Sequence, residues 1–97
     1  MRLTTAARNA IGPLLDQLIK QLDVEGRATQ RAHFDRIRRC LYGAQFEAEL
    51  TRPILDLSTS TAVGFRFSTE ADALISRILE KAEALAKELD EIQSQQH

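Results

Sequence analysis

The residues in this sequence best suited to chemistry are a single cysteine and the basic side chains around it. Cys40 directly follows Arg38 and Arg39, and His33 lies seven residues earlier. Positive charge close to a thiol favours the reactive thiolate, so this cysteine could in principle act as a nucleophile. A nucleophile also needs an oriented base and a site for the oxyanion. Because seven residues correspond to roughly two helical turns, His33 cannot reach Cys40 within one helix, and we expect a structural cysteine.

The sequence offers no pattern for metal or cofactor chemistry. Its two histidines, His33 and His97, lie far apart, and no Cys or His spacing resembles a zinc site. Carboxylates such as Glu80 and Glu83 belong to the polar side of a helical pattern, where we expect ion pairs, for example of Glu83 with Lys87. Neither a P-loop nor a glycine-rich dinucleotide fingerprint is present. We therefore predict no catalytic site, no metal site, no cofactor and no enzymatic activity.

Arginines form the most distinctive polar feature of the chain. Four of them fall within nine residues: Arg31, Arg36, Arg38 and Arg39. Such a cluster could bind the phosphates of a nucleic acid. However, residues 1–52 carry nine basic and six acidic side chains, whereas residues 53–97 carry four basic and eight acidic ones. This asymmetry favours pairing of the arginines with the acidic C-terminal segment of the same chain or of a second chain.

Length and composition narrow the class of protein. The chain has 97 residues and a formal net charge of −1, which fits one domain without an overall attraction to nucleic acid or membrane. A single cysteine excludes an intramolecular disulfide, which suits the cytoplasm. No apolar run approaches the roughly 20 residues of a membrane span, and no signal peptide is visible. We expect a cytoplasmic protein, and the excess of arginine over lysine, ten to three, hints at a bacterial genome.

Apolar periodicity predicts three long amphipathic helices. The clearest covers about residues 70–93, where apolar side chains recur in alternating steps of four and three. These residues are Ala71, Ile75, Ile78, Ala82, Leu85, Leu89 and Ile92. Ser68 or Thr69 can cap the start of this helix. The first helix is predicted over about residues 5–23, either kinked at Pro13 or broken there into two shorter helices.

The middle of the chain predicts a helix over about residues 29–51, followed by a short helical piece at 53–58 and a loop over 58–69. Pro53 is expected to end the middle helix, because the residue before a proline is biased out of helical geometry. A second apolar stripe runs along this helix, and the loop adds two phenylalanines. Together these surplus apolar residues are Tyr42, Phe46, Leu50, Phe65 and Phe67.

These elements predict an all-α fold, an elongated up-down-up bundle of three main helices with a short fourth turn near residues 53–57. The bundle forms a single domain over residues 1–97. Helices of this length are roughly 30–36 Å long, which leaves extended flanks open to a second copy. A small bundle would struggle to cover the five surplus apolar side chains by itself.

The surplus apolar residues and the opposite charges of the two halves predict a homodimer. It would act as a non-catalytic protein–protein interaction module in an adaptor, chaperone-like or regulatory role. A different protein is an alternative partner, and we expect no contact with a membrane. The candidate interface residues are Tyr42, Phe46, Leu50, Phe65 and Phe67. One alternative is a monomer in which the loop phenylalanines cover the stripe. The other is a small nucleic-acid-binding regulator that uses Arg31, Arg36, Arg38 and Arg39.

Overall fold

The computed structural model of the chain describes residues 2–60 and 64–94. Within these residues it consists of helices joined by short connections and contains no strand. In chain order the elements are α1 (Leu3–Val24), α2 (Ala28–Gly43), the 3₁₀ helix η1 (Glu47–Leu50), α3 (Thr51–Thr59) and α4 (Thr69–Ser94). They form a bundle 46 Å long and 22 by 17 Å across. The prediction of an elongated all-α bundle is therefore confirmed.

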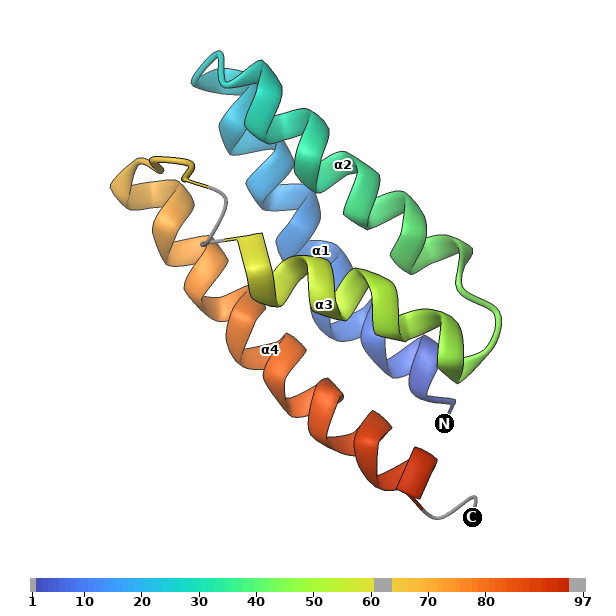
Figure 1. Cartoon of the computed structure of the whole chain (residues 1–97). Helices are drawn as coiled ribbons and strands as arrows, with labels where there is room; N and C mark the ends of the chain where they lie inside the picture. Colours follow the sequence, from blue (N-terminus) through green and yellow to red (C-terminus); the bar gives the residue numbers. More distant parts are fainter. Residues whose placement is uncertain (1, 61–63, 95–97) are drawn as a thin grey trace.

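The four α-helices surround one core, and each runs roughly antiparallel to the next (Figure 1). α1 contacts α2 and α4, and α3 closes the other side by contacting the same two helices. Because α3 is a helix of nine residues that runs back along the bundle, α4 is antiparallel to α1 (Figure 1). The start of α1 and the end of α4 consequently lie at the same end of the bundle (Figure 1).

Apolar side chains from every element fill the core. The buried ones are Leu3, Ala7, Ile11, Leu14, Leu15, Leu18, Leu22, Phe34, Ile37, Leu41, Ala44, Leu50, Ile54, Leu57, Ala71, Ile75, Ile78, Ala82, Leu85 and Leu89. They include every member of the predicted α4 seam except Ile92, which is partly buried. Ser68 caps α4 as expected, because its Oγ accepts the Ala71 N–H at 3.1 Å. The same hydroxyl donates to the Glu25 carboxylate at 2.6 Å, which ties the end of α1 to the start of α4.

α1 continues without a break across Pro13, so the alternative prediction of two shorter helices is wrong. Pro13 is exposed, whereas Gly12 beside it is buried. A Cβ at Gly12 would overlap the Tyr42 hydroxyl oxygen and lie 3.0 Å from Tyr42 Cζ. The missing side chain at position 12 therefore allows α2 to approach α1 closely through Tyr42.

The middle helix is shorter than predicted, because α2 ends at Gly43 and not near residue 51. Ala44 and Phe46 then adopt extended backbone conformations. The turn is held by side chains: the Arg8 guanidinium donates to the Ala44 carbonyl, and Glu49 Oε1 accepts the backbone N–H groups of Gln45 and Phe46 at 3.2 Å each. The predicted second apolar stripe is therefore divided between elements, because Tyr42 lies in α2, Phe46 in the connection and Leu50 in η1.

Pro53 does not end the preceding helix, contrary to the prediction. It is the third residue of α3, which spans Thr51–Thr59 and not only residues 53–58. A proline is tolerated in the first turn of a helix because its missing N–H would have no intrahelical partner there. The buried ring of Pro53 adds to the core, so this residue belongs to the start of a helix.

Candidate interaction surface

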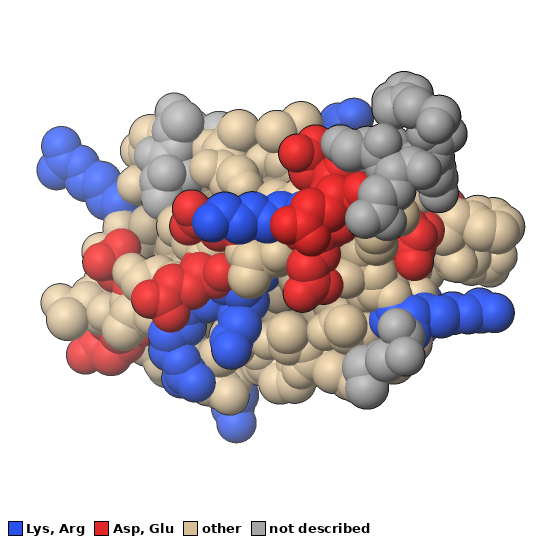
Figure 2. Space-filling model, turned by 90° about the horizontal axis from the view of Figure 1, so that it is seen from below, with Lys and Arg blue, Asp and Glu red and all other residues tan. Residues whose placement is uncertain are grey.

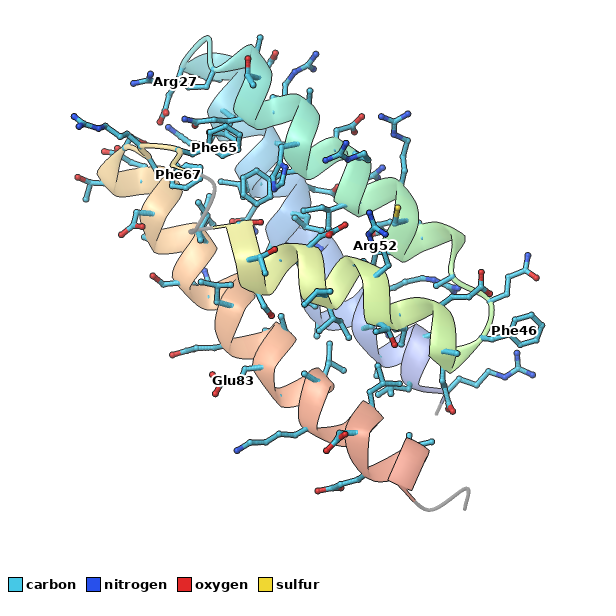
Figure 3. The ribbon with its side chains drawn as sticks, in the orientation of Figure 1. Arg27, Phe46, Arg52, Phe65, Phe67 and Glu83 are labelled. Atoms are coloured by element: carbon cyan, nitrogen blue, oxygen red, sulfur yellow. The ribbon has the colours of Figure 1, made fainter. Side chains whose placement is uncertain are left out.

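The five apolar residues predicted to form an interface do not share one surface. Leu50 is fully buried in the core, so it cannot contact a partner. Phe65 and Phe67 are partly buried and lie near the start of α2, far from Phe46 at the opposite end of the bundle (Figure 3). Tyr42 and Phe46 remain exposed, at 41% and 69%.

The loop phenylalanines pack against α2 and not over the predicted stripe. Phe65 meets the ring of His33 edge-on at 5.4 Å, and Phe67 lies 6.0 Å from both Phe65 and Phe34. His33 and Phe34 are themselves 5.0 Å apart in a T-shaped arrangement. This aromatic cluster covers the first half of α2. The loop could not reach the stripe, because α2 carries Tyr42 to the far end of the bundle.

His33 also contacts a buried serine, a pairing that the sequence did not suggest. His33 Nε2 lies 3.1 Å from Ser60 Oγ, and that hydroxyl donates to the Asp56 carbonyl at 2.7 Å. The hydroxyl proton is thus committed to a backbone carbonyl, so His33 must be the donor to Ser60 and cannot act as its base. Burial lowers the pKa of His33, with a further contribution from Arg36 that Asp56 opposes. The pair joins α2 to the end of α3.

Tyr42 is held against its own chain despite its exposure. Its ring lies over Gly12 on one side, and the guanidinium of Arg38 is 4.8 Å from the ring centre. Arg38 in turn pairs with Asp16 of α1. This arrangement gives Tyr42 a structural role in joining α1 to α2.

Most of the clustered arginines have local partners. Arg38 pairs with Asp16 and Arg31 with Asp23, both on α1, the latter at 3.6 Å, and Arg39 pairs with Asp35 one turn earlier at 3.4 Å. None of these partners belongs to α4, so the predicted pairing with the acidic C-terminal segment is wrong within one chain, and pairing with a second chain stays a prediction. The reason is topological, because α2 and α4 lie on opposite sides of the bundle. Arg36 is exposed and forms no ion pair among the described residues.

The acidic side chains of α4 gather on the face seen from below in Figure 2, with basic side chains between and around them. Among the described residues, none of the charged side chains of α4 forms an ion pair, including the pair predicted for Glu83 and Lys87. Among the described residues, the carboxylates of α4 are therefore not engaged in ion pairs within the bundle, although Arg77, Lys81 and Lys87 lie on the same helix.

Two exposed apolar side chains lie beside hollows along α4. The first hollow is enclosed by α4, η1 and the start of α1, and the second by α4 and α3. Phe46 borders a hollow of about 440 Å³. Leu55, which is 55% exposed, borders one of about 230 Å³. Leu89 lines both, so the hollows adjoin. The first is lined by Arg2, Thr4, Gln45, Phe46, Glu47, Ala48, Leu89 and Ile92. The second is lined by Thr51, Ile54, Leu55, Ser58, Ala86, Leu89 and Asp90.

Sequence reasoning missed Leu55 because it treated α3 as a single turn. The signal was nevertheless present: Ile54, Leu55 and Leu57 are three apolar residues within four positions. A helix directs neighbouring residues about 100° apart, so one of the three must face away from the core. Ile54 and Leu57 are buried, and Leu55 is the residue left outside.

The described residues contain no group of three or more His, Cys, Asp or Glu side chains that could hold a metal ion. No helix in the described part of the chain is long and apolar enough to cross a membrane. Comparisons of the chain with protein-family models, with curated proteins and with solved structures gave no match.

Proposed function

We propose that this protein is a non-catalytic helical interaction module that works as a homodimer, in an adaptor, chaperone-like or regulatory role. The observation that carries the proposal is the exposure of Phe46 and Leu55 beside adjoining hollows, although the core of the chain is already filled. Burying a Phe or Leu side chain contributes about 1.5–3 kcal/mol before the costs of binding. A second chain that covers this surface would therefore gain appreciable stability.

Sedimentation equilibrium at micromolar concentrations tests this proposal. We expect a mass of two chains that falls toward one chain on dilution. Phe46→Glu should stay folded and associate more weakly, because Phe46 makes few contacts with its own chain. Leu50→Glu is the contrasting control, because a charge at this fully buried position should prevent folding. A mass of one chain at every concentration would refute the homodimer.

Binding to nucleic acid remains the alternative, with less support. Three of the four clustered arginines already have carboxylate partners, which leaves Arg36 as the side chain most available to a phosphate. If the alternative holds, a mobility shift at low salt should weaken steeply as salt is added and should be lost in an Arg36→Glu, Arg39→Glu variant. Absence of a shift at low salt would remove it.

The proposed site of action is the cytoplasm. Cys40 is an exposed thiol with no disulfide partner, which suits a reducing compartment. Thiol titration of protein isolated from its source under anaerobic conditions should find Cys40 reduced. A mixed disulfide at Cys40 would contradict this location.

A further inference from the structure

The outward side of α3 has an apolar centre between two charged edges. Leu55 supplies the exposed apolar side chain at the centre. α2 borders α3 on one side and α4 on the other (Figure 1). We refer to this surface, from the exposed residues of α2 across α3 to those of α4, as the α3 face.

The edge of the α3 face toward α2 is basic. Arg52 projects from α3 on the side of α2 (Figure 3) and pairs with Asp56 at 3.4 Å. Arg36 of α2 is exposed and lies three residues after His33, on the neighbouring turn of the helix. His33 contacts Ser60 at the end of α3, so Arg36 belongs to the same edge. Two arginines against one aspartate leave this edge with a net charge of +1.

The edge of the α3 face toward α4 is acidic. Asp90 lines the hollow beside Leu55. Glu83 is exposed on the same helix, two turns earlier, and projects from the outer side of α4 at a level along the bundle similar to that of Arg52 (Figure 3). Lys87 lies one turn from both carboxylates, and these three side chains leave the edge with a net charge of −1.

Opposite charges on two sides of one face allow only one kind of two-fold pairing. If the two-fold axis ran across the helices, each edge would meet its own copy and like charges would face each other. If the axis runs parallel to the helices, the basic edge of one copy lies against the acidic edge of the other. Leu55 then meets Leu55 of the second copy near the axis, because a residue on a two-fold axis contacts itself.

We propose that two copies of this chain associate through the α3 face about a two-fold axis parallel to the helices, with Arg52 of each copy opposite Glu83 of the other. This inference rests on the proposed homodimer and specifies its interface. Leu55 and the hollow beside it supply the apolar centre, and the two charged edges select the orientation. Glu83, which forms no ion pair among the described residues, would then have a partner in the second copy.

A charge-swap experiment, read by sedimentation equilibrium at low salt, tests the interface. Arg52→Glu and Glu83→Arg, made singly, should each weaken dimerisation about tenfold, because each creates two like-charge contacts in a dimer. The double variant Arg52→Glu, Glu83→Arg restores opposite charges across the axis and should return the dissociation constant to within about threefold of the original. Both substituted positions, 52 and 83, are exposed, and circular dichroism checks that the fold is kept.

Matched controls carry the same changes of charge at positions outside the proposed Arg52–Glu83 pairing. Arg39→Glu and Glu80→Arg alter other exposed side chains of α2 and α4, and neither should change the dissociation constant more than about twofold.

A second measurement uses Leu55→Cys in a Cys40→Ser chain. With an added oxidant it should form a disulfide-linked dimer readily, whereas Val24→Cys in the same background, an exposed position at the end of α1, should not.

The outcomes separate the two proposals. If the protein dimerises but its dissociation constant is unchanged by Arg52→Glu and Glu83→Arg, and if it does not cross-link through position 55, the α3-face interface is refuted and the homodimer is still supported. A single-chain mass at all concentrations overturns both. Rescue in the double variant together with cross-linking at position 55 supports the parallel two-fold arrangement.

Discussion

Substitution of Gly12 by alanine should expose the close contact between α1 and α2. The new Cβ would overlap the Tyr42 hydroxyl and sit 3.0 Å from Cζ, so the ring must swing away from α1. An aromatic side chain buries about 150–250 Å², and a little over half of Tyr42 is buried. At about 25 cal/mol per Å² of buried surface, displacing the Tyr42 ring lowers the free energy of unfolding by roughly 2–3 kcal/mol. The contact between the ring and Arg38 is lost as well.

An opposing effect makes the single variant hard to interpret. Replacing glycine by alanine inside a helix stabilises it by up to about 1 kcal/mol, and a residue before proline loses part of this gain. We therefore expect Gly12→Ala to destabilise the protein by about 1–2 kcal/mol net. In a Tyr42→Ala chain the steric conflict is absent, so Gly12→Ala should be neutral or stabilising there.

A double-mutant cycle measured by urea unfolding isolates the contact. The helix-propensity and pre-proline effects are common to both backgrounds and cancel, which leaves a coupling energy of about 2–3 kcal/mol. Gly43→Ala is the control, because a Cβ at that position has nothing within 4 Å apart from its own chain neighbours, and its coupling to Tyr42 should be near zero. A coupling below about 0.5 kcal/mol for Gly12 would refute the close approach.

Two further predictions concern the polar links between elements. Burial lowers the pKa of His33 from its usual 6.5, so the unfolded chain binds a proton at this residue more tightly than the folded chain does. The free energy of unfolding should therefore be highest above about pH 6.5 and should decrease as the pH falls below that value. Urea unfolding against pH should show this decline, and His33→Gln should flatten it; an unchanged slope would contradict the prediction. Ser68→Ala should cost about 1 kcal/mol, because it removes the cap of α4, and thermal unfolding beside a Thr69→Ala control should resolve the loss.

α4 shows which structural features can be predicted from the periodicity of apolar residues and from short-range spacing alone. Its apolar seam was predicted residue by residue, because a helix without Gly or Pro displays its buried face directly in its sequence spacing. Its Ser68 cap was also predicted, since capping depends on groups only a few residues apart. Both properties are local, and neither requires a distant part of the chain.

The segment around Gly43 shows where local information fails. Helical spacing continues from Phe34 to Leu50, yet the helix stops at Gly43. The turn depends on Arg8, which reaches the Ala44 carbonyl across 36 positions of sequence, and on the burial of Leu50, whose short helix η1 contacts α1 and α3. Phe46 and Leu50 have the same spacing pattern, but one is exposed and the other is core.

The sequence by itself determined the all-α class, the faces of α1 and α4, and the absence of a recognisable catalytic motif, because each follows from residue type and short-range spacing. Only the tertiary structure decided which arginines meet aspartates of α1, which apolar side chains remain outside, and that basic and acidic edges flank α3. These features depend on the direction in which each helix returns along the bundle. That direction is decided by the total burial achieved in the folded chain, which no local window of sequence contains.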